Sequence, residues 1–195
     1  MNDIQKKLPF MTAVFSHLIF QGLVLYRGAE MTLNNTDMST FASKNRLFLS
    51  LFTIPLVIAL VFANLGIISK VVIFSIVSFI TGMTYHSTKD LREALLEMIG
   101  IFIAMVIAGF ITVHFGLNLR LMGLILFFGL LTLLIVRLFR PGDKSYAKIG
   151  VLIFMLYIVY DTNQILQRNY GGDFVSATLD YFIDIINLLS LSEEN

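Results

Sequence analysis

The chain has 195 residues, of which 57% are hydrophobic and only 14% are charged, and its mean hydropathy is +0.83. A soluble globular domain is near half apolar and a quarter charged, so this composition predicts an integral membrane protein. Cysteine is absent, which excludes a disulfide framework and a thiolate metal site. The net charge of +1 offers no basic surface for nucleic acid, and no nucleic-acid partner is expected.

Seven segments are apolar and long enough to cross a bilayer, which takes about 17 to 25 residues in a helix. The first follows a short polar N-terminus and is interpreted as a retained span rather than a signal peptide. Asn64, Leu65 and Gly66 must turn the chain between the second and third segments. The sequence therefore predicts a single all-α polytopic membrane domain over residues 1–195. Its predicted spans are 8–26, 47–64, 67–86, 93–114, 117–138, 145–168 and 174–191.

The segment from Arg27 to Arg46 is the longest and most polar connection and is expected to be a loop. With the N-terminus in the cytoplasm, five lysines and arginines would lie inside and nine outside, so the charge bias favours an external N-terminus. The sequon Asn34-Asn35-Thr36 is usable only if this connection is lumenal, which favours the opposite orientation. The two signals disagree, and the topology stays open at this stage.

The predicted fourth span carries two further features. Glu97, one turn into this span, is either an acid of an ion path or an interfacial residue paired with Arg92 or Lys89. Small residues repeat every four positions along the same helix, which lets helix backbones approach closely. They serve either packing inside the bundle or a dimer interface. These residues are Gly100, Ala104, Ala108 and Thr112.

Three aspartates, Asp161, Asp180 and Asp184, lie in the last two predicted spans, which are otherwise apolar. A charged side chain at the membrane centre costs about 2.5 to 3.5 kcal/mol on insertion scales, so these acids need a specific role. Asp180, Asp184 and Asn187 are spaced i, i+4, i+7 and share one helix face. If the chain turns near residues 169–172, Asp161 lies about 10 Å below the turn, Asp180 about 9 Å and Asp184 about 15 Å. Either Asp180 or Asp184 can therefore meet Asp161.

Two carboxyl groups close together in a medium of low dielectric constant cannot both be ionised cheaply. One is then expected to hold a proton, and the pair titrates as a unit that responds to pH. When ionised, the same oxygens, assisted by the side-chain carbonyls of Asn163 or Asn187, form the hard-oxygen environment that Ca²⁺ prefers. The alternative is that the acids are hydrogen-bonded packing residues that hold the last helix in the bundle.

Around these acids the sequence resembles the transmembrane Bax inhibitor motif family. That family ends its sixth span with an aromatic or aliphatic residue followed by Asp, then Thr or Leu, and Ile. A short loop with Gly-Asp and a seventh span with a further aspartate follow. The stretches that match in order and spacing are Tyr160-Asp161-Thr162-Asn163-Gln164-Ile165, Gly172-Asp173 and Ile183-Asp184-Ile185-Ile186-Asn187-Leu188. Phe79–Thr84 and Leu96–Gly100 are similar to the family's third and fourth spans.

This resemblance implies seven transmembrane helices, with the last helix central between two three-helix layers and the N-terminus in the cytoplasm. It also implies a pH-sensitive calcium leak channel that modulates calcium homeostasis, and suppression of cell death in eukaryotic members. The family's paired aspartates, which form the pH gate and a transient Ca²⁺ site, fall on Asp161 and Asp184. The further candidates for the ion path are Asp180, Glu97, Asn187 and Asn163.

The expected partners are the lipid bilayer, Ca²⁺ and protons, together with other membrane proteins of cell-death signalling. No cofactor is expected, because Ca²⁺ enters only as the permeant ion. The implied location is a plasma membrane, a bacterial inner membrane or the endoplasmic reticulum.

The chain also departs from the family pattern. Bacterial members carry a glutamate in the second span and an arginine after it that partners the sixth-span aspartate, but residues 47–64 contain no acid and Asn64-Leu65-Gly66 follows them. Either the gating differs, or the chain is a non-conducting interaction protein that inhibits apoptosis or stress signalling. A cation/proton exchanger is a third alternative.

A second resemblance is weaker. Tyr160-Asp161 followed by Gly171-Gly172-Asp173 is similar to the motifs of intramembrane aspartyl proteases. Tyr170 stands where that motif needs glycine, and Asp173 falls in the predicted loop. No enzyme activity is therefore expected.

Overall fold

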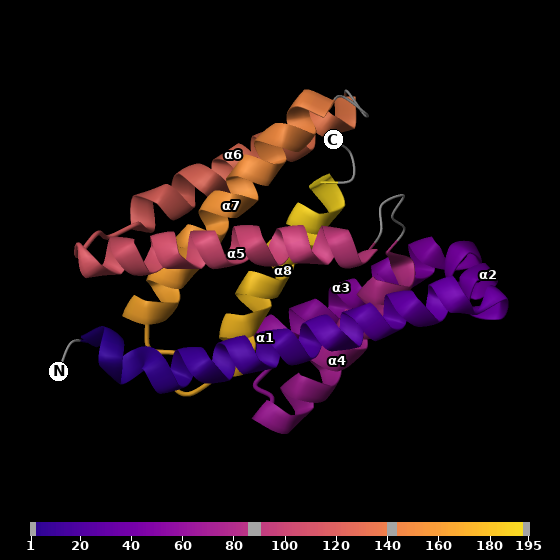
Figure 1. Ribbon diagram of the computed structural model, residues 1–195, viewed down its shortest axis with the longest axis horizontal. Helices are drawn as coiled ribbons and strands as arrows, with labels where there is room; N and C mark the ends of the chain where they lie inside the picture. The colour runs from indigo at the N-terminus through magenta and orange to yellow at the C-terminus, as the bar shows by residue number, and fades with distance from the viewer. Residues whose placement is uncertain (1–2, 86–90, 140–143, 193–195) are drawn as a thin grey trace. The chain divides into compact units, whose positions relative to one another are not determined.

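The computed structural model describes residues 3–85, 91–139 and 144–192, and within these ranges it is helical apart from short turns, with no strand (Figure 1). This confirms the predicted all-α class. The helices in the described part of the chain are α1 (Asp3–Asn34), α2 (Thr36–Lys44), α3 (Arg46–Phe62), α4 (Ile67–Thr84), α5 (Leu91–His114), α6 (Arg120–Phe139), α7 (Lys144–Gln167) and α8 (Phe174–Ser192).

Six of these helices, α1 and α4 to α8, are each long and apolar enough to cross a membrane. Helix α3 has 17 residues, or about 26 Å at 1.5 Å per residue, slightly less than the ~30 Å hydrocarbon core. Helices α2 and α3 are bent by 73° at Asn45 and pass the same test only as a pair. The described chain thus has six spans, or seven if the bent pair is one.

Helices α1 and α4 run in the same direction, and their contacts are in matching order. Gln21 contacts Ser75 and Ser78, and further along both helices a Cβ atom on Gly82 would meet the backbone of Leu25. Two consecutive spans joined directly would be antiparallel. The bent α2–α3 pair must therefore bring the chain back between α1 and α4, which favours the predicted count of seven.

Packing divides the chain into two compact units, and the helices α1 and α8 contribute to both. One unit contains α5, α6, α7, the first residues of α1 and α8 from Asp180 onward; within it, α7 packs against both α5 and α6. The other contains α2, α3, α4, most of α1 and α8 up to Leu179; within it, α3 packs against α4. The last helix is thus shared between two groups that each hold three long helices.

A buried polar network joins α1 to α4. The side chain of Gln21 is fully buried, and its Oε1 accepts a hydrogen bond of 2.8 Å from Ser78 while its Nε2 donates to Ser75 at 3.3 Å. His17 Nε2 lies 2.9 Å from the same amide nitrogen, and the His17 ring packs edge-on against Phe74. Neutral polar pairs of this kind hold membrane helices together in the absence of a hydrophobic driving force.

The prediction of a loop from Arg27 to Arg46 is wrong, because most of this segment is helical. Helix α1 continues to Asn34, and α2 begins at Thr36. The side chain of Asn35 causes the restart, since its Oδ1 accepts hydrogen bonds from the backbone nitrogens of Asp37 (2.9 Å) and Met38 (3.1 Å), as an N-cap residue does. The predicted turn at residues 64–66 is confirmed, since α3 ends at Phe62 and α4 begins at Ile67.

The small-residue face of α5 does not pack inside its unit as one stripe. Gly100 and Ala104 are exposed, and no atom lies within 4 Å of a Cβ placed on Gly100. Gly109, outside the predicted stripe, makes the close approach instead and packs on the side chain of Thr162 of α7. Of the other predicted features, His86 at the end of the third span, Lys89 and the break at 140–143 lie outside the described residues.

Candidate functional site: an acid cluster on α7 and α8

The carboxyl groups of Asp161 on α7 and Asp184 on α8 lie close enough to each other to form a hydrogen bond. Asp184 is 4% exposed, and Asp161 is partly buried. The sequence left open whether Asp180 or Asp184 would meet Asp161, and the family resemblance assigned Asp184. The structure brings together the pair that the resemblance assigned.

Two carboxyl groups can form a hydrogen bond only if one of them carries a proton, because ionised carboxylates are acceptors only. Oδ2 of Asp184 is completely buried, and no N–H or ordinary hydroxyl among the described residues donates to it. A buried acceptor without a donor is unfavourable by about 1 to 3 kcal/mol, and by more when it is charged. A hydrogen bond between Asp161 and Asp184 therefore requires one proton on the pair.

Asp180 is the third member of the cluster and lies within electrostatic range of both Asp161 and Asp184. Its Oδ2 accepts a hydrogen bond of 3.1 Å from the hydroxyl of Tyr170, which lies in the connection between α7 and α8. Burial raises the pKa of the Tyr170 hydroxyl, and the adjacent Asp180 carboxylate raises it further. Tyr170 therefore remains a neutral hydrogen-bond donor throughout the physiological pH range.

The side chains beside the cluster are packed and hydrogen-bonded. Tyr181 is fully buried, donates to Thr162 Oγ1 at 2.8 Å, and receives the edge of the Phe102 ring at a centroid distance of 5.2 Å. Gly123 of α6 leaves room for the ring of Tyr160, the residue before Asp161. Helix α7 is thereby held on both sides, by α5 at Gly109 and by α6 at Gly123, which fixes the position from which Asp161 projects.

The two asparagines predicted to assist the acids are engaged elsewhere. Asn163 is buried and donates from Nδ2 to Thr112 Oγ1 (2.9 Å) and to the carbonyl oxygen of Leu117 (3.0 Å), while its Oδ1 accepts from Gln167. Asn187 donates to the carbonyl of Ile183 in its own helix. Asn163 thus anchors the α5–α6 connection on α7 rather than facing the carboxyl pair.

Glu97 lies on the exposed face of α5, and no contact between it and the three aspartates is found among the described residues. Its predicted partner Lys89 is outside the described ranges, as is the side chain of Arg92. A role for Glu97 in an ion path stays a prediction.

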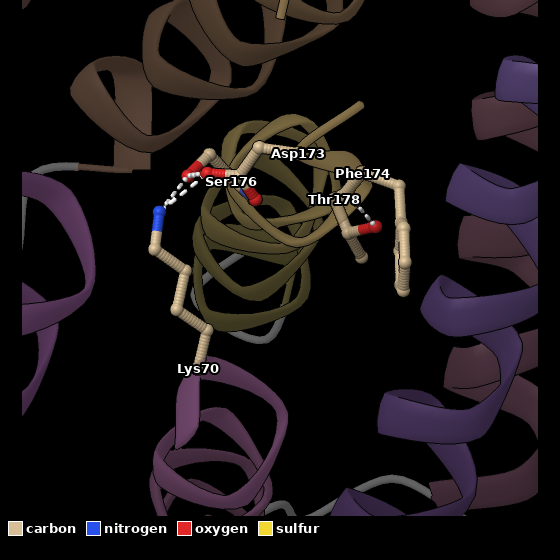
Figure 2. A network of polar contacts seen from close by, with 5 residues as sticks. All are labelled: Lys70, Asp173, Phe174, Ser176 and Thr178. Atoms are coloured by element: carbon tan, nitrogen blue, oxygen red, sulfur yellow. Dashed lines mark hydrogen bonds and ion pairs between the residues drawn. The ribbon is translucent and has the colours of Figure 1, made fainter. Parts of the chain in front are cut away.

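A separate polar cluster lies at the beginning of α8. The carboxylate of Asp173 caps the helix by accepting from the backbone nitrogen of Ser176 (3.1 Å) and from its hydroxyl (2.7 Å). Figure 2 shows the side chain of Lys70, from the first turn of α4, extending to both Asp173 and Ser176, where Nζ pairs with the carboxylate and donates to Ser176 Oγ at 3.0 Å. Burial by itself would raise the pKa of Asp173, but the hydrogen bonds from Lys70 and Ser176 and the Lys70 charge outweigh it, so the pKa lies below its ordinary value.

No group of three or more histidine, cysteine, aspartate or glutamate side chains in the described ranges is arranged to hold a metal ion. The site offers a buried carboxyl group on α8 and a partly buried one on α7 that are close enough to share a proton, with a third acid on α8.

Sequence reasoning missed two features of this region. The first is the hydrogen bond from Tyr170 to Asp180, whose partners are 10 positions apart in the sequence. The second is the ion pair of Lys70 with Asp173, whose partners are 103 positions apart. Neither separation corresponds to a helical repeat, so no periodicity could reveal them. A lysine at the first turn of an apolar segment was the one available signal for Lys70, and a single basic residue there is most simply interpreted as an interfacial anchor.

Fold and site together define a polytopic helical membrane protein with two carboxyl groups close together on its last two helices. The chain belongs to the Bax inhibitor family: the family model described as "Inhibitor of apoptosis-promoting Bax1" matches residues 8–191. This confirms the resemblance seen at Asp161, Asp173 and Asp184, and extends it to nearly the whole chain.

Relatives with names of the same kind support the assignment. The chain is 30% identical over 115 residues to "Bax inhibitor 1" of Schizosaccharomyces pombe, covering 55% of this chain and 42% of that protein. It is 27% identical over 120 residues to "Protein LIFEGUARD 4" of Arabidopsis thaliana, covering 57% and 49%. The match to "Protein LIFEGUARD 3" of the same plant is 25% over 204 aligned positions, covering 92% and 80%. The matched part thus spans less than half the length of the first two relatives.

Proposed function

We propose that this protein is a proton-sensitive calcium leak protein in which Asp161 and Asp184 form the gate. The observation that carries the proposal is the close approach of these two carboxyl groups on neighbouring membrane helices, which allows them to share a single proton. Carboxyl groups of a purely structural kind would be expected to pair with a base or a neutral donor. Among the described residues, no such partner donates a hydrogen bond to Asp184 Oδ2.

The proposed mechanism follows from the charge of the pair. With one proton present, α7 and α8 are held together at this level. When that proton leaves, two negative charges face each other in a medium of low dielectric constant and repel strongly. The repulsion is relieved if the helices separate, or if a divalent cation binds the same oxygens. Protons and Ca²⁺ therefore compete for one site, with Asp180 as the next carboxylate along α8.

The family assignment supports a role of this protein in the regulation of apoptosis. Because the family model and the S. pombe relative both carry names that refer to inhibition of Bax, we infer that the chain inhibits apoptosis. The partners we infer are the bilayer, Ca²⁺, protons and other membrane proteins of cell-death signalling. The membrane we infer is the plasma membrane, an inner membrane or the endoplasmic reticulum.

A second candidate function is that of a non-conducting interaction protein. It is favoured by the sequence of α3, Arg46–Phe62, which has no acidic residue in the place where bacterial relatives carry a glutamate. In that case the acid pair acts as a packing contact between α7 and α8, and the inhibition of apoptosis depends on binding to other membrane proteins.

The deciding experiment is calcium influx into dye-loaded liposomes that contain the purified full chain, measured at pH 6 and pH 8. The variants are Asp161→Asn and Asp184→Asn, and Asp37→Asn serves as control because Asp37 is an exposed acid in the first turn of α2. We expect a flux in the wild type and in Asp37→Asn that changes with pH, and no such dependence in either gate variant.

The absence of flux above that of empty liposomes at both pH values would refute the leak and leave the interaction protein. Flux that requires an opposing proton gradient would indicate an exchanger instead.

A further inference from the structure

The connection between α7 and α8 places one aromatic side chain over the acid cluster. The connection runs from Arg168 to Asp173, and most of its residues are exposed, but Tyr170 is partly buried. Gly171 and Gly172 have φ values of +60° and +87°, which residues with a Cβ atom rarely adopt. These two glycines reverse the chain directly after Tyr170, so the tyrosine is fixed at a tight turn rather than in a loose loop.

The position of Tyr170 relative to the acids follows from the order of residues on α8. Asp180 and Asp184 are one helical turn apart on one face, and Asp180 is nearer to the start of the helix. The Tyr170 hydroxyl donates to Asp180 Oδ2 at 3.1 Å, so the ring lies at the loop end of the line of acids. The charged groups in range of Tyr170 are Asp180, Asp161 and Arg168. An ion or a reagent that approaches from this end meets Tyr170 and Asp180 before it meets Asp184.

We propose that Tyr170 is a cover residue, which closes the loop end of the acid cluster and is held in place by its hydrogen bond to Asp180. The proposal deepens the proposed function, because it assigns a second control point to the same path. It does not depend on calcium conduction, because access to the acids can be measured directly.

Chemical modification tests this access. The purified full chain at pH 7 is treated with a water-soluble carbodiimide and glycine ethyl ester, and the modified fractions of Asp180 and Asp184 are measured by peptide mass spectrometry. The variants are Tyr170→Phe, which removes only the hydroxyl, and Tyr170→Ala, which removes the ring as well. The matched controls are Tyr146→Phe and Tyr146→Ala, because Tyr146 lies in the first turn of α7, about 22 Å along the helix from Asp161.

A hydrogen bond to a carboxylate changes an equilibrium by a factor of about ten or more. We therefore expect modification of Asp180 to rise about tenfold in Tyr170→Phe. In Tyr170→Ala we expect a larger rise, which extends to Asp184. The Tyr146 variants should match the wild type. Equal modification of Asp180 in the wild type and in Tyr170→Phe and Tyr170→Ala would overturn the proposal.

The thermal midpoint of each variant shows whether the chain is folded, and Tyr170→Phe keeps the test decisive if Tyr170→Ala is unstable. Calcium flux in liposomes is measured on the same samples. If modification of Asp180 rises in the Tyr170 variants while the wild type passes no calcium, the leak function is refuted and the assignment of Tyr170 as cover residue is supported. If the wild type conducts and the modification is unchanged, only the assignment of Tyr170 is refuted.

Discussion

At the scale of single residues, Asp173 combines two roles that respond differently to substitution. It caps α8 through Ser176, and it forms an ion pair with Lys70 of α4. Asparagine caps helices about as well as aspartate but carries no charge, whereas alanine neither caps a helix nor carries a charge. The two roles can therefore be separated with one pair of variants.

The ion pair gives a defined pH dependence. Because the pKa of Asp173 is lower in the folded protein than its ordinary value of about 3.9, the ionised carboxylate stabilises the fold above about pH 4. This contribution is lost as the pH falls through the folded pKa, since the unfolded chain then binds more protons. We expect Asp173→Asn to lower the free energy of unfolding by about 0.2 to 1 kcal/mol at pH 7, and to have a smaller effect at pH 2.5.

Asp173→Ala should add the loss of the cap, about 0.5 to 2 kcal/mol, at both pH values. Lys70→Met should reproduce the result of Asp173→Asn at pH 7. Unfolding followed by circular dichroism in detergent measures these differences. A deficit of Asp173→Asn that is the same at pH 7 and pH 2.5 would show that the ion pair does not contribute.

The residues of the acid cluster show what a sequence can and cannot reveal. Asp161, Asp180 and Asp184 were identifiable because charged residues in apolar helices are rare, and helical spacing placed two of them on one face. The choice of Asp184 as partner needed the family resemblance, since axial distances alone allowed both. Tyr170 gave no signal, because its hydrogen bond depends on how the turn at Gly171 and Gly172 folds.

At the scale of helices, apolar composition and length located the six helices that can each cross a membrane, but the first of them extends beyond both of its predicted ends. The predicted loop after the first span has few apolar residues, yet α1 continues to Asn34, and Asn35 starts α2. Packing faces were equally hard to predict. The regular small-residue stripe of α5 has Gly100 and Ala104 exposed, whereas the isolated Gly109 makes the close contact with α7. Small residues in a sequence show that a helix can approach a neighbouring helix closely, but only the folded structure shows at which residue the two helices meet.

The crossing of α1 and α4 provides a prediction at this scale. A Cβ atom on Gly82 would overlap the carbonyl group of Leu25, and backbone atoms cannot rotate away as a flexible side chain can. We expect Gly82→Ala to destabilise the protein by about 1 to 3 kcal/mol or more, as overpacking does.

Gly100→Ala is the matched control, because Gly100 is also helical and no atom lies within 4 Å of its added Cβ. There the better helix propensity of alanine should stabilise the protein by up to about 1 kcal/mol. Thermal midpoints of the two variants, compared with the wild type in the same detergent, give the answer. Equal midpoints for Gly82→Ala and Gly100→Ala would mean that α1 and α4 do not approach closely at Gly82.

At the scale of the whole molecule, the number of membrane crossings follows from one contact between the start of α1 and the end of α7. Lys7 Nζ near the start of α1 donates to the carbonyl oxygen of Arg168 just after α7, at 2.6 Å. These two residues must lie on the same side of the membrane, so the chain crosses an even number of times between them. Helices α1, α4, α5, α6 and α7 supply five crossings, and the bent α2–α3 pair supplies the sixth. With α8 the total is seven, although α3 alone is short.

Because the chain contains no cysteine, single cysteines can report this topology directly. With seven crossings, Gln5→Cys and Leu65→Cys in sealed vesicles react with a membrane-impermeant thiol reagent from the same side, and Asn195→Cys reacts from the other. If α2 and α3 only dipped into the bilayer and returned, Leu65→Cys would react from the side opposite to Gln5→Cys, and the two ends of the chain would share one side. The family resemblance implies that the side of Gln5 is cytoplasmic, whereas the lysine and arginine count favours the outside. The same labelling therefore decides whether the contacts of Lys7 and Lys70 lie on the cytoplasmic face, from which Tyr170 would then control access to the acids.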